Sequence, residues 1–304
     1  MDHSGRSACL YSFAYGLFGL SRRIVYEARV QYSNMCVLIG LLKERGYLMS
    51  AVSVGISSSA DALNEQLVDI WQRYRARLNH KFLNRAPLFF GDFSTHCILF
   101  IGFNPSYSPR GSRARYANTK YKDLSSKDFQ WKSMEGKELE EYIDRCNEIE
   151  KISRKKYSYF KIFHEIAQDS KLEFEHIDLF FLREKSQNKV RELVYPIPPR
   201  KQVSQLTPFG NDQIQVSFAA IDIIEPEIIF VANAVASEII RNQRGERLKW
   251  EESLGTDTLL VKGKKVPIFF SGMISGQRRL DNESLKRLKW HIRYVLKHLN
   301  LLTD

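Results

Sequence analysis

The stretch Cys97–Pro105 reads CILFIGFNP, and the chain continues as Ser106–Pro109 (SYSP). Five apolar residues precede Gly102, and Asn104 then stands between an aromatic residue and a proline. A short apolar run that ends at glycine and proline is typical of a buried strand in a mostly parallel sheet. Side chains just beyond the carboxyl end of such a strand face the crevice where α/β proteins bind ligands. We therefore expect Asn104 to face a ligand, and a purely structural turn residue is the alternative.

The rest of the chain continues this pattern of buried strands and amphipathic helices. Apolar runs predict strands at His176–Leu182, Ile228–Ala232 and Val266–Phe270, the last one preceded by a hairpin-like Leu259–Val261. Apolar spacing predicts helices over Asp61–Leu83 and Glu283–Leu299. We also expect a helix over Asp212–Ile224 and either one long helix or two over Glu138–Gln168. We expect Asn233 to cap the helix after the third strand, with a ligand contact as the alternative. The order predicts an α/β fold, a three-layer α/β/α domain over residues 49–304 with a central four-stranded, mostly parallel sheet.

Residues 1–48 differ from the rest of the chain. Ala8–Leu20 and Met35–Leu42 are apolar, but each is shorter than the ~20 residues that a membrane-spanning helix needs. We expect a peripheral extension, with Met49 opening the functional chain. A helix that lies on a membrane surface is the alternative.

Basic residues are concentrated in two stretches. The 304-residue chain carries 46 Lys and Arg against 35 Asp and Glu, a formal net charge of +11, and its 43% apolar content predicts a folded core. Ser106–Lys122 holds five basic residues and no acidic one, and Arg278–Lys297 holds seven basic residues against two acidic ones. Tyrosines are interleaved with the arginines of the first stretch, which favours a nucleic-acid partner. A solvated basic surface that serves solubility is the alternative.

The four cysteines, Cys9, Cys36, Cys97 and Cys146, are far apart in the sequence. Without a Cys-x-x-Cys pair they argue against a zinc ribbon, an iron–sulfur cluster and a disulfide framework, and they favour a reducing cytoplasm. The seven histidines show no spacing typical of metal ligands. We therefore expect no metal and no cofactor.

Two short motifs resemble those of the uracil-DNA glycosylase superfamily. Gly102–Ser106 (GFNPS) is similar to the first motif and closest to the mismatch-specific thymine/uracil branch, which carries Gly-x-Asn-Pro-Gly. Met273–Gly276 (MISG) resembles the second motif, which is Asn-Pro-Ser-Gly in the mismatch branch and His-Pro-Ser in the uracil branch. The Ser-Gly pair matches this motif, whereas Met273 and Ile274 depart from it.

The resemblance implies a site that holds a base flipped out of DNA and hydrolyses its N-glycosidic bond. It implies that Asn104 orients the attacking water, where the uracil branch has an Asp. Ser106 takes the place of a bulky Tyr of the uracil-specific enzymes, which implies room for a substituent at C5 of the pyrimidine. Tyr116 corresponds to a base-stacking aromatic residue, with packing under a loop as its alternative. Arg183 either reads the base edge or pairs with Glu184. The implied base pocket consists of Gly102, Phe103, Ser106, Tyr116, Arg183 and Met273.

The second motif departs from the family at a position that matters. The residue at the position of Met273 normally supports the departing base, and a thioether cannot donate a hydrogen bond. Ser275, the second implied catalytic residue, would clamp the phosphate beside the flipped nucleotide, and Gln277–Leu280 would enter the minor groove. The implied DNA-binding residues are Arg110, Arg113, Arg115, Gly276, Gln277, Arg278 and Arg279.

These features predict a monofunctional DNA glycosylase, since neither motif holds a lysine that could form a Schiff base. It would release uracil or a 5-modified pyrimidine and leave an abasic site, in DNA repair or in defence against phage with modified-base DNA. The expected partner is double-stranded DNA, with no membrane, and the expected state is a cytoplasmic monomer. The alternatives are a catalytically inactive, glycosylase-like DNA-binding module and a nucleotide- or RNA-directed N-glycosidase.

Overall fold

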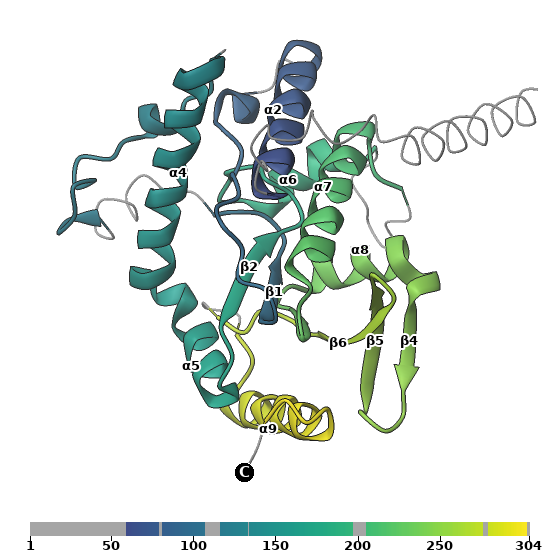
Figure 1. Cartoon of the computed structure of the whole chain (residues 1–304). Coiled ribbons are helices and arrows are strands. Elements are labelled where there is room, and N and C mark those ends of the chain that lie inside the picture. Colours follow the sequence, from purple (N-terminus) through teal and green to yellow (C-terminus); the bar gives the residue numbers. More distant parts are fainter. Residues whose placement is uncertain are drawn as a thin grey trace, which may run out of the picture. The chain divides into compact units, whose positions relative to one another are not determined.

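The computed structural model describes residues 59–78, 81–106, 116–132, 134–196, 205–275 and 279–302 (Figure 1). The predicted extension over residues 1–48 lies outside these ranges. Within them the chain has an α/β fold built on a six-stranded sheet. In this described part of the chain, no helix has the length and apolar character needed to cross a membrane.

The six strands follow the order β2-β1-β3-β6-β5-β4. Four neighbours are parallel, namely β2 (Phe174–Asp178), β1 (Ile98–Gly102), β3 (Ile228–Val231) and β6 (Lys264–Phe270). The sheet continues in antiparallel pairing with β5 (Thr256–Val261) and β4 (Leu248–Glu251). The prediction of four, mostly parallel strands was therefore wrong, because the sheet has six strands and is mixed. The edge strand β4 reads LKWE, and without a buried apolar run it gives no strand signal.

Seven α-helices pack around this sheet within the described ranges. They are α2 (Ser59–Leu78), α4 (Gly136–Lys156), α5 (Lys161–Ser170), α6 (Gln187–Val194), α7 (Pro208–Ile224), α8 (Ala234–Arg244) and α9 (Asn282–His298). Short 3₁₀ helices are η1 (Lys81–Asn84), η2 (Ser126–Phe129), η3 (Ser158–Phe160) and η4 (Gly245–Arg247). Each predicted helical region contains a helix, but the first ends at Leu78 instead of Leu83. The longest region forms two helices, α4 and α5, which η3 separates. Helix α6 was not predicted, because its eight residues bury only two apolar side chains and show no clear apolar periodicity.

The side chains of β1 enter two separate hydrophobic clusters. Leu99 and Ile101 pack in the cluster that includes α2, α7 and α8, whereas Ile98 and Phe100 pack in the cluster that includes α5 and α9. Successive side chains of a strand point to opposite faces of the sheet. Helices therefore cover both faces, as the predicted three-layer arrangement requires.

The end of β2 differs from the sequence expectation. β2 ends at Asp178, which pairs with Gly102 at the end of β1, so the predicted strand His176–Leu182 continues four residues too far. Beyond Asp178 the chain follows the GFNPS segment, because the N–H of Leu179 donates to the Gly102 carbonyl at 3.2 Å. As a result Asp178, rather than Arg183, lies at the sheet edge beside Gly102.

Candidate active site

A cavity of about 310 Å³ lies at the carboxyl edge of the parallel strands. Its walls come from Leu88–Phe93, from the segments after β1, β2, β3 and β6, from the second half of α4 and from η3. The cavity is lined by Asn104 and by every residue of the predicted base pocket, Gly102, Phe103, Ser106, Tyr116, Arg183 and Met273. It is also lined by Glu150, Arg154, Tyr159, His176, Asp178 and Asn233. The structure thus brings the first motif and Met273 of the second motif to one cavity.

Backbone carbonyls hold the carboxamide of Asn104. Its Nδ2 donates to the carbonyl oxygen of Glu184 at 2.6 Å and to those of Leu182 and Pro105 at 3.2 Å each. Within the described ranges, no hydrogen bond reaches its Oδ1. Because a carboxamide is planar, fixing Nδ2 also fixes the direction of Oδ1, which can only accept hydrogen bonds. Asn104 therefore offers a ligand or a water a well-oriented acceptor.

Asp178 places a buried carboxyl in the same cavity. Its side chain lies against Gly102, where an added Cβ would come within 2.1 Å of Oδ1. Burial and the nearby Glu150 carboxylate raise the pKa of Asp178 to about 8, although Arg154 and Arg183 act in the opposite direction. The group is therefore mainly protonated at neutral pH. A protonated carboxyl can donate one hydrogen bond and accept others.

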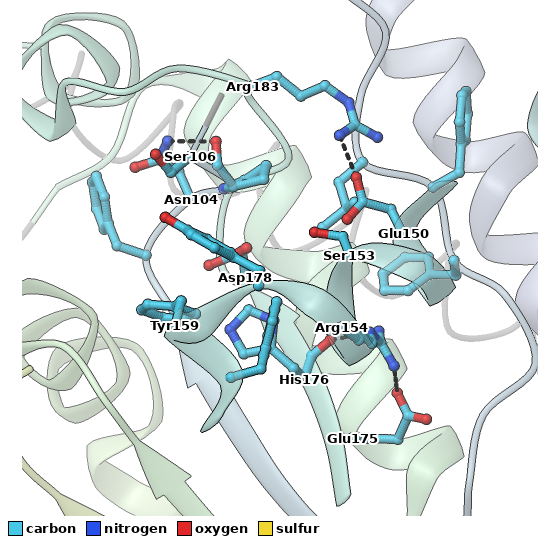
Figure 2. Close-up of a pocket in the computed structure, with 18 of the residues that line it drawn as sticks. Asn104, Ser106, Glu150, Ser153, Arg154, Tyr159, Glu175, His176, Asp178 and Arg183 are labelled. Atoms are coloured by element: carbon cyan, nitrogen blue, oxygen red, sulfur yellow. Dashed lines mark hydrogen bonds and ion pairs between the residues drawn. The ribbon is translucent and has the colours of Figure 1, made fainter. Parts of the chain in front are cut away.

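His176 lies two residues before Asp178, so both side chains point to the same face of β2. Its ring stacks on Phe163 with the ring centroids 5.7 Å apart. Burial, with Arg154 nearby, lowers the pKa of His176 to about 3, and the ring is neutral at neutral pH. Its Nε2 is buried and has no hydrogen-bond partner among the described residues. Figure 2 shows this ring beside Asp178.

Two ion pairs connect α4 to β2 and to the segment after it. Arg154 donates to the carboxylate of Glu175 at 2.7 Å, and Arg183 donates to that of Glu150 at 2.6 Å. Both pairs are visible at the cavity wall in Figure 2. Each of these two arginines therefore has a carboxylate partner other than Asp178.

The predicted pairing of Arg183 with Glu184 is wrong. Arg183 pairs with Glu150, and Glu184 instead forms an ion pair with Arg85 at 3.4 Å. The Nε and Nη2 atoms of Arg183 are buried, and neither has a hydrogen-bond partner within the described ranges. The sequence could not indicate this arrangement, because Glu150 is separated from Arg183 by more than thirty residues.

Two further predicted residues have structural contacts. Tyr116 is only 2% exposed, packs in the larger hydrophobic cluster, and donates from its hydroxyl to the Ile149 carbonyl at 3.4 Å. Tyr116 is thus a packed side chain, in agreement with the alternative given for it, and it also lines the cavity. Asn233 caps α8 as predicted, since its Oδ1 accepts from the N–H groups of Val235 and Ala236 at 2.9 and 3.1 Å.

Ser275 lines a different hollow from Asn104. This second hollow, of about 290 Å³, lies between the segment after β6 and the η3–α5 region. It contains Lys161, Arg279 and Glu165, and the Glu165 carboxylate pairs with Lys289 at 3.2 Å. A hydroxyl with two cationic side chains suits a phosphate group. The other predicted DNA contacts lie outside the described residues, namely Arg110, Arg113, Arg115, Gly276, Gln277 and Arg278.

Sequence reasoning missed several side chains of the cavity, among them His176, Asp178 and Glu150. His176 and Asp178 stand at alternate positions in the run HIDLFFL, and this alternation was the available signal that one face of the strand borders a polar site. Glu150 gave no such signal, because α4 is charged along most of its length and its charges resemble a solvated face.

Comparison with known proteins identified no relative that bears on these roles. No protein-family model matches the chain, and no curated protein has significant sequence similarity to it. In the described part of the chain, no three His, Cys, Asp or Glu side chains come together in a way that could hold a metal ion.

Proposed function

We propose that this chain is a monofunctional DNA glycosylase that hydrolyses the N-glycosidic bond of a flipped pyrimidine in double-stranded DNA. The proposal includes a cytoplasmic, monomeric protein and a three-layer, uracil-DNA-glycosylase-like architecture. In that architecture β2, β1, β3 and β6 would be the central parallel strands.

The observation that carries the proposal is the fixed carboxamide of Asn104 in a cavity of suitable size. Ligand pockets range over ~300–1,000 Å³, and about 310 Å³ is at the small end of this range. Such a cavity has room for one extruded nucleoside rather than for a duplex, as chemistry on a base in DNA requires. The aromatic side chain of Tyr159 is partly exposed, lines the same cavity and offers a surface on which a base can pack.

The chemistry follows from the charges that develop as the bond breaks. Positive charge forms on the sugar and negative charge on the departing base, so the site needs a positioned water and polar groups near the base. The Oδ1 atom of Asn104 can accept a hydrogen bond from that water and direct its oxygen at C1′. A carboxamide is a poor proton acceptor, so the reaction depends on a good leaving group. Ser106 lines the cavity and is exposed, which leaves space for a substituent at C5 of the pyrimidine.

The second hollow supports the same proposal. Ser275, Lys161 and Arg279 lie together there, and the MISG segment contributes Met273 to the first cavity. A phosphate held in the second hollow would belong to the backbone beside the nucleotide in the cavity. We expect binding to be strongly weakened by salt, because phosphate contacts release counterions.

A substrate panel tests the proposal. Duplexes with a single uracil, a mismatched thymine, or a hydroxymethylated or glucosylated cytosine are incubated with the full chain, and abasic sites are measured by alkaline strand cleavage. We expect release from at least one of them, loss of that release in Asn104→Ala, and unchanged DNA affinity. Asn188→Ala, at an exposed position of α6, is the matched control. Release that persists in Asn104→Ala would remove Asn104 from the reaction.

Met273 favours a second candidate, a catalytically inactive DNA-binding module. Its thioether lines the cavity where the resemblance places a group that supports the departing base, and it has no hydrogen to donate. Tight duplex binding with no abasic sites on any substrate of the panel would support this candidate over the enzyme.

A further inference from the structure

Asp178 is a polar group in the cavity that the proposed chemistry has not used. The residue is 4% exposed, it lines the cavity, and no described residue forms a hydrogen bond with its carboxyl oxygens. A buried carboxyl without a partner lowers the stability of the folded protein. A ligand that supplies the missing hydrogen bonds would explain why such a group is placed there.

We propose that Asp178 recognises the N3–N4 edge of a flipped cytosine, so that the base released is cytosine or a 5-substituted cytosine rather than uracil or thymine. This inference rests on the glycosylase function proposed above and names its substrate class. It is carried by the position of the carboxyl, which lies over Gly102 in the cavity that holds Asn104.

The hydrogen-bonding pattern of cytosine matches a carboxyl group. Cytosine presents a ring nitrogen, N3, that accepts a hydrogen bond, next to the N4 amino group that donates one, and Asp or Glu side chains accept from N4. A protonated carboxyl donates to N3 and accepts from N4 at the same time. An ionised carboxyl still accepts from N4, although it faces the lone pair of N3, whereas it would repel the O4 oxygen of uracil or thymine. In the protonated state uracil and thymine also match the carboxyl, because they donate from N3–H and accept at O4. The discrimination therefore comes from transfer of the carboxyl proton to N3, which only cytosine leaves free.

Burial and the Glu150 carboxylate keep the proton on Asp178, against the opposing effect of two arginines. Glu150 and Arg154 face it from α4 and Arg183 from the segment after β2, while His176 on its own strand is neutral. Tyr159 on η3 is also neutral, since burial and the Asp178 charge raise its pKa. The two arginines pair with Glu175 and Glu150, as described above, and not with Asp178.

His176 provides a second polar atom at this place. Its Nε2 lies 3.3 Å from the position of a Cβ on Gly102, the same position that lies 2.1 Å from Oδ1 of Asp178. Both atoms therefore border the same spot beside Gly102. The Nε2 of His176 is thus a second buried polar atom beside Gly102 with no partner among the described residues.

The proton of Asp178 also makes the base a better leaving group, which the reaction needs because the Asn104 carboxamide is a poor proton acceptor. As the C1′–N1 bond breaks, its electron pair goes to the base and the Asp178 proton goes to N3, so the base leaves uncharged. The water held by Asn104 forms the new bond to C1′ and loses one proton to solvent, and solvent returns a proton to the Asp178 carboxylate. Uracil and thymine carry a hydrogen at N3 and cannot take this proton there.

The experiment compares matched duplexes that carry cytosine, 5-methylcytosine, 5-hydroxymethylcytosine, uracil or thymine at one position. We expect at least one cytosine derivative to be released about tenfold or more faster than uracil and thymine. In Asp178→Asn, which keeps a donor and an acceptor but has no transferable proton, we expect release of that derivative to fall by about 100-fold or more. Asp144→Asn, at an exposed position of α4, should behave like the wild-type chain.

The outcomes separate the two proposals. Faster release of uracil or thymine, or an unchanged ratio of cytosine to uracil release in Asp178→Asn, would overturn the role of Asp178 and leave the glycosylase function intact. No release from any duplex of this set or of the substrate panel above would overturn both. If Asp178→Asn does not fold, the wild-type pH profile decides instead. Release of the cytosine derivative should then fall about tenfold per pH unit above the pKa of the carboxyl, and a flat profile would contradict the proton transfer.

Discussion

The contact between Gly102 and Asp178 allows a quantitative test of how the cavity is built. A Cβ added to Gly102 would lie 2.1 Å from Oδ1 of Asp178, more than 1 Å inside an ordinary contact of ~3.5 Å. The φ angle of Gly102 is not in the left-handed region, so alanine adds no backbone strain. The change acts through this clash alone. We expect Gly102→Ala to lower the free energy of unfolding by ~1–3 kcal/mol, as overpacking does in other cores.

The test is a double-mutant cycle in urea. In an Asp178→Ala background the clashing oxygen is gone, and the next contact of the new Cβ is the Nε2 of His176 at 3.3 Å. Gly102→Ala should then cost less than ~0.5 kcal/mol, which gives a coupling of ~1–2 kcal/mol between the two positions. Gly272→Ala, where a Cβ would meet no atom within 4 Å, is the control. An equal cost of Gly102→Ala in both backgrounds would refute the close packing of this glycine against the carboxyl.

Three other predictions concern stability. Glu150→Gln leaves the buried Arg183 without its carboxylate partner, so the free energy of unfolding in urea should fall by ~3 kcal/mol. Glu141→Gln, in an exposed ion pair on the same helix, should lower it by less than ~0.5 kcal/mol. Similar losses in the two variants would contradict the buried pair. Asn233→Ala removes the cap of α8 and should lower the free energy of unfolding by ~1 kcal/mol. Asn233→Ser should largely restore it, because serine also caps helices. A serine variant as unstable as the alanine variant would show that capping is not the role of Asn233. The pKa of Asp178 is raised from 3.8 to about 8, so the folded state keeps a proton that the unfolded state loses. Its contribution to stability should therefore fall as pH rises from about 4 to about 8, and Asp178→Asn should lose this slope; an identical pH dependence in both proteins would count against the shift.

The sequence predicted the elements whose signals are local. β1, β3 and β6 are apolar runs closed by turn residues, so their patterns match their buried surroundings. α9 buries one regular stripe, and α7 is apolar enough for most of its residues to be buried. β4 is half-exposed at the sheet edge, and its stability comes from pairing with β5, which a short polar sequence does not reveal. The end of β2 was misplaced because Leu179–Leu182 is as buried as the strand itself, although it follows the GFNPS segment instead of extending the sheet.

The site was predictable only where a motif or a strand end marked it. Asn104, Ser106 and Met273 follow strands that the sequence showed, and the cavity contains all three. The electrostatics of the site depend on contacts between distant segments. Glu150 comes from the middle of α4, and it both pairs with Arg183 and raises the pKa of Asp178. No local pattern carries that information, because the effect appears only after α4 packs beside β2.

The position of β1 has a consequence for how the protein loses activity on heating. This strand has a neighbour on each side and a hydrophobic cluster on each face. Its amide protons should exchange with deuterium only when the sheet itself opens, as is usual for the most protected segments of a domain. Asn104 is attached two residues beyond this strand, so fraying elsewhere leaves it in place. Thermal inactivation should therefore coincide with global unfolding instead of preceding it.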